Sequence, residues 1–471
     1  MIKRSISFAL ALVLCVGLSF GQNNPKYIFY LIGDGMGLNQ VHAAEVFLAS
    51  QQQKNTTVPM VFSTFPVASH ATSHSLSHGV TDSGAGGTAL AVGFKTKNGV
   101  IGMDSAGVKS YKSIAYMAKE KGMKVGITTS VSIDHATPAS FYANQKDRNM
   151  YYEIGQDIIK SNFDFFGGSG FLKPETNAKK ETVAPLYPQL EKAGYTLLYG
   201  MKDFNQVKKG QNKLILMNDK GTPASSLKFA IDQKQGDMNL ANITEAAIKT
   251  LSQGKQGFFL MVEGGKIDWA CHANDGASAI HEVLDFNKAV EKAYEFYKKH
   301  PKETLIIVTA DHETGGLGVG NGGSTLRLGQ IASQKISQEE LSAKINELRK
   351  NSPNATWEDV KNLISTETGL WTKVKADEAE IKAAYEKSFI NHQNETSKSL
   401  YATIDKIASL SINALNKASS LSWASGSHSA AYIPIFAIGV GAEKFSHKMD
   451  NVDIPRTVAE IAGWKFDELT Y

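Results

Sequence analysis

The chain has 471 residues, of which 42% are hydrophobic and 20% are charged. This composition is typical of a globular protein with enough apolar material for a large core. The net charge is only +4, from 50 Lys and Arg residues against 46 Asp and Glu residues, which argues against a nucleic-acid-binding protein or one that binds membrane surfaces.

The N-terminal residues 1–22 have the pattern of a secretory signal peptide. Two basic residues precede an apolar run from Ile6 to Phe20, and small and polar residues follow it. The run is short for a membrane span, and no stop-transfer pattern follows. Cleavage would remove Cys15 and leave Cys271 as a lone cysteine. We therefore expect an exported protein, periplasmic or secreted, with no disulfide within the chain and no stable membrane insertion.

Five short apolar runs predict buried strands along the chain. They are Tyr27–Ile32, Val125–Thr128, Phe258–Val262, Leu305–Val308 and Ile435–Ile438. Helical stretches alternate with them, for example at Ser113–Lys121 and Ala279–Tyr297. This alternation predicts a layered α/β domain that extends over residues 23–471.

Residues 324–422 differ from the rest of this domain. They are rich in Lys, Glu, Ala, Ser and Asn at helical spacing, and they lack strong strand runs. Ser337 is followed three residues later by Glu340, the pattern of a capping box that opens a helix. A strand-like run returns at Ile433, so we interpret residues 324–422 as a helical insertion in the α/β domain.

Acidic and histidine residues follow the predicted strands. Gly-Asp-Gly at 33–35 follows the first strand, Glu263 and Asp268 follow the run that ends at Val262, and Asp311-His312 follow the run that ends at Val308. The functional crevice of an open α/β sheet lies beyond the carboxyl ends of its strands. Each motif alone is as easily a turn or an exposed helix face. Together they predict one site at this edge.

The spacing of these residues favours metal ions. Asp268 and His272 are four residues apart, so on a helical turn both point to the same side. Oxygen and nitrogen ligands without thiolates suit Zn²⁺ held by Asp and His, and Mg²⁺ held by carboxylates and hydroxyls.

The stretch Asp82-Ser83-Gly84 leaves three alternatives open for Ser83. The triplet is the one that carries the nucleophile of chymotrypsin-like proteases, and Ser is also a favoured helix N-cap before a Gly/Ala-rich run. The third alternative is that Ser83 accepts a group other than an acyl group.

Six motifs resemble the alkaline phosphatase family, in the family's order from Tyr27 to about Phe445 and outside the insertion. They are Gly33–Gly37, Thr81–Ala85, His135–Ala139, Val262–Asp268, Thr309–Gly316 and Gly426–His428. The resemblance implies a three-layer α/β/α sandwich around a mostly parallel sheet. It also implies an exported phosphomonoesterase that acts through a phosphoserine intermediate, and a homodimer.

The resemblance also assigns roles to single residues. It makes Ser83 the phosphate-accepting nucleophile, Arg148 the guanidinium that binds two phosphate oxygens, and Asp82 the residue that orients Arg148. It implies two Zn²⁺ sites and one Mg²⁺ site. The ligands of the zinc that activates the serine are Asp34, Asp311 and His312. The ligands of the second zinc are Asp268, His272 and His428. The magnesium ligands are Glu263 and Thr137, with Asp34 shared.

Two positions depart from the best-known bacterial pattern of the family. His135 and Trp269 stand where that pattern has Asp and Lys. Mammalian members also have His at the first position, and some cold-adapted bacterial members resemble this His/Trp pair. His135 adds an imidazole to the third metal site, which then takes Zn²⁺ or binds Mg²⁺ more weakly. Trp269 faces the phosphate without a cation.

The competing hypotheses are a phosphodiesterase or sulfatase of the same superfamily, and a non-catalytic exported protein that binds zinc or phosphate. A sulfatase needs Cys or Ser in a Cys/Ser-x-Pro-x-Arg setting, which is absent around Ser83. Diesterases generally lack the third-metal glutamate that Glu263 supplies. A protein that only binds zinc or phosphate needs no nucleophile, so the presence of Ser83 argues against that hypothesis. A protease needs His and Asp residues beside its serine, and here the metal motifs already use the His and Asp residues at the strand ends. The expected substrates are therefore small phosphate monoesters.

Overall fold

The computed structural model describes residues 24–465 of the chain. The signal peptide predicted at residues 1–22, with Cys15, lies outside the described residues. Cys271 is a buried free thiol. Within residues 24–465, no helix is both long and apolar enough to cross a membrane.

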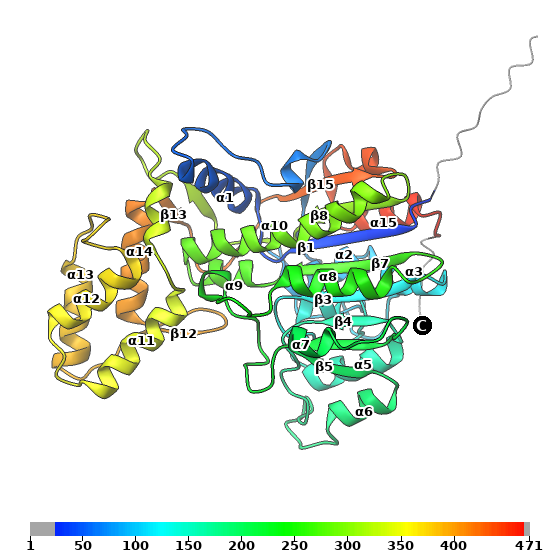
Figure 1. Ribbon diagram of the computed structural model, residues 1–471, viewed down its shortest axis with the longest axis horizontal. Helices are drawn as coiled ribbons and strands as arrows, with labels where there is room; N and C mark the ends of the chain where they lie inside the picture. The colour runs from blue at the N-terminus through cyan, green and yellow to red at the C-terminus, as the bar shows by residue number, and fades with distance from the viewer. Residues whose placement is uncertain (1–23, 466–471) are drawn as a thin grey trace, which may run out of the picture.

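The core of the molecule is a ten-stranded, mostly parallel sheet (Figure 1). From one edge to the other, its strands are β16 (Met449–Asp450), β2 (Val67–Thr72), β15 (Ile433–Gly439), β8 (Thr304–Thr309), β1 (Tyr27–Gly33), β7 (Phe258–Gly264), β3 (Lys124–Thr129), β4 (Phe165–Gly167), β6 (Leu214–Met217) and β5 (Thr196–Tyr199). Only β15 runs antiparallel to its neighbours, β8 and β2. The five predicted strands are confirmed, as β1, β3, β7, β8 and β15.

Successive residues of the central strand β1 pack on opposite faces of the sheet, because strand side chains alternate. The Phe29 ring lies 5.6 Å from that of Phe296 on α10 (Gly276–Lys299). The next residue, Tyr30, donates a hydrogen bond of 3.2 Å to the carbonyl of Leu90 on α2 (Ser83–Val92). The sheet is therefore covered by helices on both faces, which confirms the predicted three-layer α/β/α sandwich.

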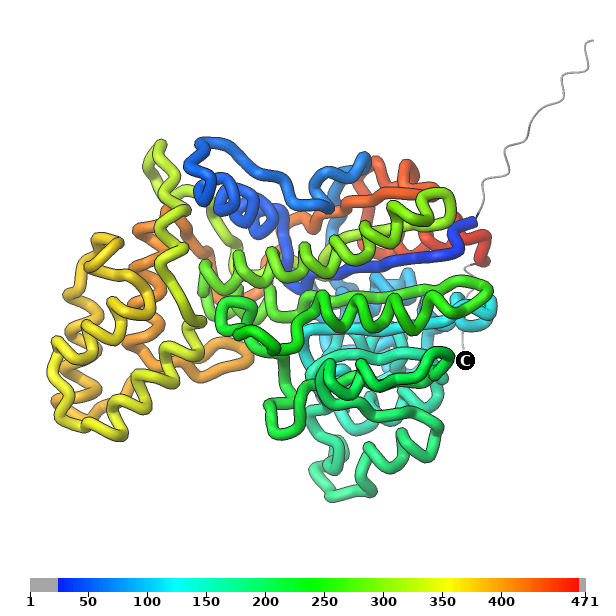
Figure 2. Tube along the Cα trace, in the orientation of Figure 1, coloured from blue at the N-terminus to red at the C-terminus, as the bar shows by residue number. Residues whose placement is uncertain are grey.

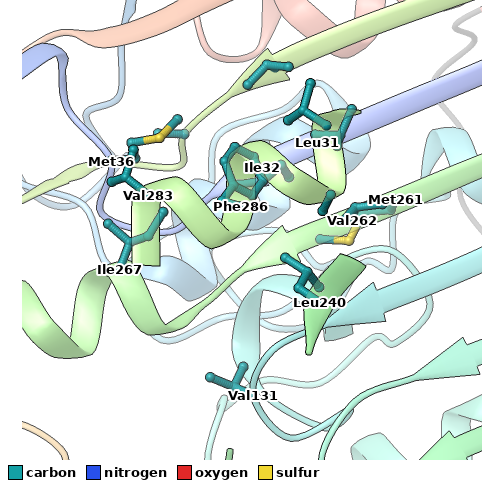
Figure 3. Packing of buried hydrophobic residues seen from close by; sticks show 14 of the residues in the cluster. Leu31, Ile32, Met36, Val131, Leu240, Met261, Val262, Ile267, Val283 and Phe286 are labelled. Carbon is teal, nitrogen blue, oxygen red and sulfur yellow. The ribbon is translucent and has the colours of Figure 1, made fainter. Parts of the chain in front are cut away.

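Apolar side chains fill the space between the sheet and α10 (Figure 3). Ile32 and Val262 of the two central strands and Phe286 of α10 are at most 1% exposed. The remaining helices of the α/β domain are α1 (Leu38–Gln51), α3 (Ile114–Glu120), α4 (Ala136–Ala139), α5 (Tyr151–Ser161), α6 (Leu186–Lys192), α7 (Gly200–Phe204), α8 (Leu240–Leu251), α9 (Lys266–His272) and α15 (Asp453–Ile461). The predicted helices at Ser113–Lys121 and Ala279–Tyr297 correspond to α3 and α10.

The insertion, residues 324–422, forms a mainly helical lobe beside the sandwich (Figures 1 and 2). Its helices are α11 (Gln338–Asn351), α12 (Trp357–Thr368), α13 (Ala379–Tyr385) and α14 (Lys406–Ala418). Ser337 caps α11 by accepting a hydrogen bond from the Glu340 amide, as the capping pattern predicts. The lobe also contains an unexpected hairpin of β11 (Thr396–Lys398) and β12 (Thr403–Asp405).

A short antiparallel ladder joins the lobe to the sandwich. Strand β13 (Leu421–Trp423), at the end of the insertion, pairs with β10 (Leu317–Val319). Just beyond, β14 (His428–Ser429) pairs with β9 (Glu313–Thr314), which follows β8. The chain thus leaves and re-enters the α/β domain at the edge where β1, β7 and β8 end.

Candidate active site

The segments that follow β1, β7 and β8 meet at one edge of the sheet. Strand β1 is parallel to both neighbours, with Gly33 opposite Gly264 and Ile32 opposite Thr309. Asp34, Glu263 and Asp311 therefore emerge side by side, and each is 0% exposed. The site predicted at the carboxyl ends of the strands lies there.

The first metal-binding cluster lies directly beside Ser83. One ligand atom each from Asp34, Asp311 and His312 lies within 4.8 Å of the others. His312 Nε2 is 3.4 Å from Asp34 Oδ1 and 3.5 Å from Asp311 Oδ2. Ser83 Oγ is 3.2 Å from the same imidazole nitrogen. The serine hydroxyl is therefore the side chain that faces this cluster.

The second cluster consists of Asp268, His272 and His428. Asp268 and His272 lie four residues apart on α9, as their spacing predicts, and the β14–β9 pairing brings in His428. The Nδ1–H groups of His272 and His428 donate to the carbonyls of Gly426 at 2.7 Å and Thr81 at 2.8 Å. When both rings are neutral, these bonds leave the two Nε2 lone pairs facing each other at 3.1 Å. Two acceptors at that distance need a proton or a metal ion between them. Burial lowers the pKa of His428, but its interaction with Asp268 raises it overall, so a proton takes this place where no metal is bound.

The third cluster, on the other side of Asp34, contains His135 and Glu263. Thr129 donates a short hydrogen bond to Glu263 Oε2, which leaves Oε1 for a ligand. The Thr137 hydroxyl lies at the same place and donates to Asp311 Oδ2 at 3.2 Å. A histidine thus joins two carboxylates and a hydroxyl at the third site.

Buried polar atoms without hydrogen bonds make all three clusters candidate cation sites. Within residues 24–465, both carboxylate oxygens of Asp34, both ring nitrogens of His135, Glu263 Oε1 and Asp268 Oδ2 are buried and make no hydrogen bond. Such atoms are costly unless a ligand satisfies them. The donor set of carboxylates and imidazoles without a thiolate fits Zn²⁺ and Mg²⁺.

The electrostatics of the site lead to the same conclusion. Burial, with the charge of Asp311 beside it, raises the pKa of Asp34 well above its ordinary value. Burial raises the pKa of Glu263 to about 8, and burial with the nearby charge of Asp268 raises the pKa of Asp311 to about 6. Burial, with the Arg148 cation, lowers the pKa of His135 to about 3, so this imidazole is a neutral ligand. Without a cation these carboxyl groups therefore tend to keep their protons, and a bound cation would favour their charged forms.

The local fold of α2 positions Ser83. Asp82, not Ser83, caps this helix by accepting a hydrogen bond of 3.0 Å from the Ala85 amide. The N-cap alternative for Ser83 is therefore wrong, because Ser83 is the first helical residue and its hydroxyl is directed at His312. Gly86 allows α2 to approach the sheet edge, since a Cβ there would lie 2.8 Å from the Asp311 carbonyl oxygen. The glycines of this motif thus serve close packing of backbones.

Arg148 lies at the same helix end. Its Nη1 donates to Asp82 Oδ2 at 3.0 Å, and Asp82 also accepts hydrogen bonds from the Gly99 amide. Burial lowers the pKa of Arg148, but the neighbouring Tyr401 and Asp82 raise it above the ordinary value, so the side chain is a permanent cation. A helix N-terminus beside a fixed guanidinium is a site for an anion such as a phosphoryl group.

Trp269, predicted to face the phosphate, is 9% exposed, and its buried indole Nε1 makes no hydrogen bond with any of the residues that the structure describes. Its ring centroid lies 6.1 Å from that of His135. Tyr401 of the insertion stacks on Trp269 at 4.3 Å.

Sequence reasoning missed three residues that contact the clusters. Thr129 binds Glu263, Thr314 donates to Asp268 Oδ1 at 2.5 Å, and Tyr401 covers Trp269. The position of Thr314 beside the Asp-His motif was the one available signal, because a hydroxyl next to metal ligands commonly holds one of them. No local pattern marks Thr129 or Tyr401.

Comparison with known proteins identifies the family. The model of the alkaline phosphatase family matches residues 25–464. The chain belongs to the alkaline phosphatase family. Alkaline phosphatase 3 of Bacillus subtilis (strain 168) is 32% identical over 447 residues, which cover 93% of this chain and 89% of that relative. Family membership identifies the chain as a phosphoric monoester hydrolase and argues against a non-catalytic binding protein.

Solved structures of the family have the same fold. The cold-active alkaline phosphatase of a psychrophilic Shewanella sp. is 26% identical, with a TM-score of 0.77 over 93% of this chain and 99% of that one. The alkaline phosphatase of the Antarctic bacterium TAB5 is 25% identical, with a TM-score of 0.65 over 94% of this chain and 99% of that one. Two variants of the TAB5 enzyme, in which a histidine is replaced by Glu or by Asp, hold Mg in the site called M3.

Proposed function

We propose that this phosphomonoesterase is metal-dependent and acts through a phosphoserine intermediate on Ser83. The observation that carries the proposal is the position of the Ser83 hydroxyl. It lies 3.2 Å from His312 Nε2, at the N-terminus of α2. A serine in a protease would face a histidine that is oriented by a single carboxylate. His312 instead lies within 3.5 Å of both Asp34 and Asp311, in a cation-binding cluster.

Three ions fit the donor sets. We assign Zn²⁺ to the cluster beside Ser83 and to the second cluster, the two that combine carboxylate with imidazole in the way Zn²⁺ prefers. We assign Mg²⁺ to the third cluster, with Zn²⁺ as its competitor there because His135 adds a nitrogen ligand. The TAB5 variants that hold Mg have a carboxylate in place of a histidine, which agrees with the preference of Mg²⁺ for oxygen ligands; this chain keeps the His135 imidazole, which is why Zn²⁺ competes at its third cluster.

The residues of the chain divide the work of phosphoryl transfer. Arg148 binds two non-bridging oxygens of the monoester, and the backbone amides at the start of α2 bind the third non-bridging oxygen. The Ser83 hydroxyl gives its proton to solvent, and its oxygen forms a bond to phosphorus while the bond from phosphorus to the alcohol oxygen breaks. The alcohol leaves with a proton from water.

Water then attacks the phosphoserine, restores the Ser83 hydroxyl and releases inorganic phosphate. When bound, the ions supply Lewis-acid stabilisation of the attacking and leaving oxygens. Asp82 keeps Arg148 in place in both steps through its 3.0 Å bond to Nη1, while its other bonds hold the start of α2. A neutral serine hydroxyl is a weak nucleophile, and a cation held by the cluster beside Ser83 would activate it by favouring loss of its proton.

A phosphodiesterase of the same superfamily is the alternative for substrate class. Glu263 favours a monoesterase, because it completes a third site next to the nucleophile's cluster. For location and assembly, we propose a periplasmic or secreted protein that forms a homodimer. Mass spectrometry of the exported protein tests the location by giving the position of the new N-terminus after cleavage. Light scattering tests the homodimer by giving the molecular mass in solution.

The decisive test of the activity combines metal analysis with substrate choice. Purified protein should contain two equivalents of zinc and one of magnesium or zinc, and it should release phosphate from an aryl monoester much faster than from the matching diester. Faster hydrolysis of the diester would contradict the proposal. So would full activity after exhaustive chelation.

A further inference from the structure

The insertion reaches the active site through the tip of its one hairpin. Strands β11 and β12 pair from Thr396 to Asp405, and the Ser399 amide donates to the Ala402 carbonyl at 2.9 Å to close the turn. Leu400 at the tip is 60% exposed, whereas its neighbour Tyr401 is directed into the sandwich. Figure 1 shows this hairpin, beside the β12 label, projecting from the helical lobe toward the α/β domain.

The base of the hairpin is held firmly to the lobe. Asp405 caps α14 by accepting a hydrogen bond from the Ile407 amide at 2.8 Å, and it pairs with Arg349 of α11 at 2.6 Å. The Asp405 amide in turn donates to Ser342 Oγ at 2.8 Å. The position of the tip is therefore set by the lobe and does not depend on the tip's own contacts alone.

The Tyr401 ring lies beside Trp269 and beside one histidine each of the second and third clusters. Its ring is stacked on Trp269, with centroids 4.3 Å apart and planes 13° apart. Its centroid is 5.7 Å from that of His272 in the second cluster and 5.7 Å from that of His135 in the third. The ring thus covers the space between the leaving-group side and the third metal site.

The hydroxyl of Tyr401 has no partner in residues 24–465, although its oxygen is buried. It lies near enough to the Arg148 guanidinium for the two groups to interact electrostatically. A phenol hydroxyl donates a hydrogen bond, whereas a guanidinium cannot accept one. A buried donor without an acceptor is costly, so an anion bound by Arg148 would satisfy both groups.

We propose that Tyr401 is a substrate-binding residue supplied by the insertion, and that its hydroxyl donates a hydrogen bond to a non-bridging phosphoryl oxygen beside Arg148. This inference rests on the proposed function. The insertion thereby takes a direct part in phosphate recognition. The Tyr401 hydroxyl supplies a neutral hydrogen-bond donor next to Trp269, a side chain that carries no positive charge for the phosphate. Stacking alone does not account for the hydroxyl, because a phenylalanine would stack equally well.

The test compares two Tyr-to-Phe variants of the same insertion in the metal-loaded protein. Tyr401→Phe removes the hydroxyl and keeps the ring. Tyr385→Phe is the control, because the Tyr385 hydroxyl donates to the Ala355 carbonyl at 2.9 Å inside the lobe. For each variant, calorimetry measures the binding of inorganic phosphate. Assays with an aryl monoester measure kcat/KM and the inhibition constant of phosphate, and thermal melting measures the Tm.

We expect Tyr401→Phe to weaken phosphate binding and to raise its inhibition constant by about tenfold, as for loss of one hydrogen bond to a charged group. The Tm and the metal content should remain those of the parent. Tyr385→Phe should leave phosphate binding unchanged. Parental phosphate affinity in Tyr401→Phe would overturn the inference alone, because the parent would still hydrolyse monoesters. Absence of hydrolysis in the metal-loaded parent would overturn the proposed function and this inference together.

Discussion

Replacing Arg148 by Ala removes the only guanidinium placed beside Ser83 in the described part of the chain, and its effect can be worked out from the structure. Arg148 and Asp82 form an ion pair of 3.0 Å, with side chains 16% and 19% exposed. Asp82 is itself fixed by hydrogen bonds from the Ala85 and Gly99 amides. The guanidinium is therefore oriented before substrate arrives, and little entropy is lost when phosphate binds.

The magnitude follows from the bonds that are lost. A bidentate, charge-assisted contact at a partly exposed site contributes about 2–3 kcal/mol, which corresponds to a rise of about 30- to 140-fold in the phosphate inhibition constant. Asp82→Asn should cost much less. Asn is also a good N-cap, so α2 keeps its start, and only the charge that orients Arg148 is lost, worth about 0.5–1 kcal/mol or roughly two- to fivefold.

The assay is competition by inorganic phosphate against an aryl monoester, with the metal content of each variant measured in parallel. Arg148→Ala should retain all its metal, since Arg148 belongs to none of the three clusters. In the Arg148→Ala background, Asp82→Asn should have no further effect on phosphate inhibition. Unchanged inhibition in Arg148→Ala would refute the role of Arg148, and a full Asp82→Asn effect in the double variant would refute the role of Asp82.

Four further outcomes are expected. Ser83→Ala should lower kcat by several orders of magnitude with metal content unchanged, leaving only slow direct hydrolysis by water; steady-state kinetics near those of the parent would contradict this. Trp269→Lys should strengthen phosphate inhibition and lower maximal turnover at alkaline pH, because it adds a cation and slows product release; an unchanged inhibition constant would show that this side chain does not face the phosphate. His135→Asp should increase the activation by added Mg²⁺ in a titration, because a carboxylate suits Mg²⁺ better than an imidazole does; an identical titration curve would argue against a role at the third site. In chelated protein, Glu263 keeps its proton in the folded state up to about pH 8, against 4.5 for an ordinary glutamate. The folded state then binds more protons than the unfolded state, so the Tm of chelated protein should fall as the pH rises from about 5 to 8, and added metal should remove this dependence; a Tm that rises over that range would refute it.

The sequence was sufficient to predict the central strands and the residues that gather at their ends. β1, β7 and β8 are buried throughout because helices cover the sheet on both sides, so most of their residues form continuous apolar runs that stand out in the sequence. Their parallel arrangement then places Asp34, Glu263 and Asp311 at one edge. The four-residue spacing of Asp268 and His272 needs only a helical turn to bring them together.

The outer strands were harder to predict for a physical reason. β4 has three residues and β16 has two, too few to show a strand period against their surroundings. Phe165 and Phe166 mark β4 only as apolar core. The N-cap alternative for Ser83 could not be excluded from the sequence because Ser is a favoured cap, and only the hydrogen bond from the Ala85 amide shows that Asp82 caps α2.

Tyr401 could not have been predicted from the sequence. It lies in a polar, partly exposed hairpin, and its contacts with Trp269 and His272 join positions more than a hundred residues apart in the chain. Nothing in residues 396–405 indicates which side chain turns inward. Only the way the lobe packs on the α/β domain places Tyr401 over the site.

The most direct test of the central claim is to trap the intermediate. Metal-loaded protein would be mixed with an aryl monoester, quenched in acid within the first turnover, digested, and the peptide that contains Ser83 analysed by mass spectrometry, with Ser83→Ala as the control. We predict one phosphoryl group on Ser83 in the parent and none in the control. Rapid release of alcohol with Ser83 unmodified at every quench time, or a phosphoryl group on another residue, would contradict the mechanism.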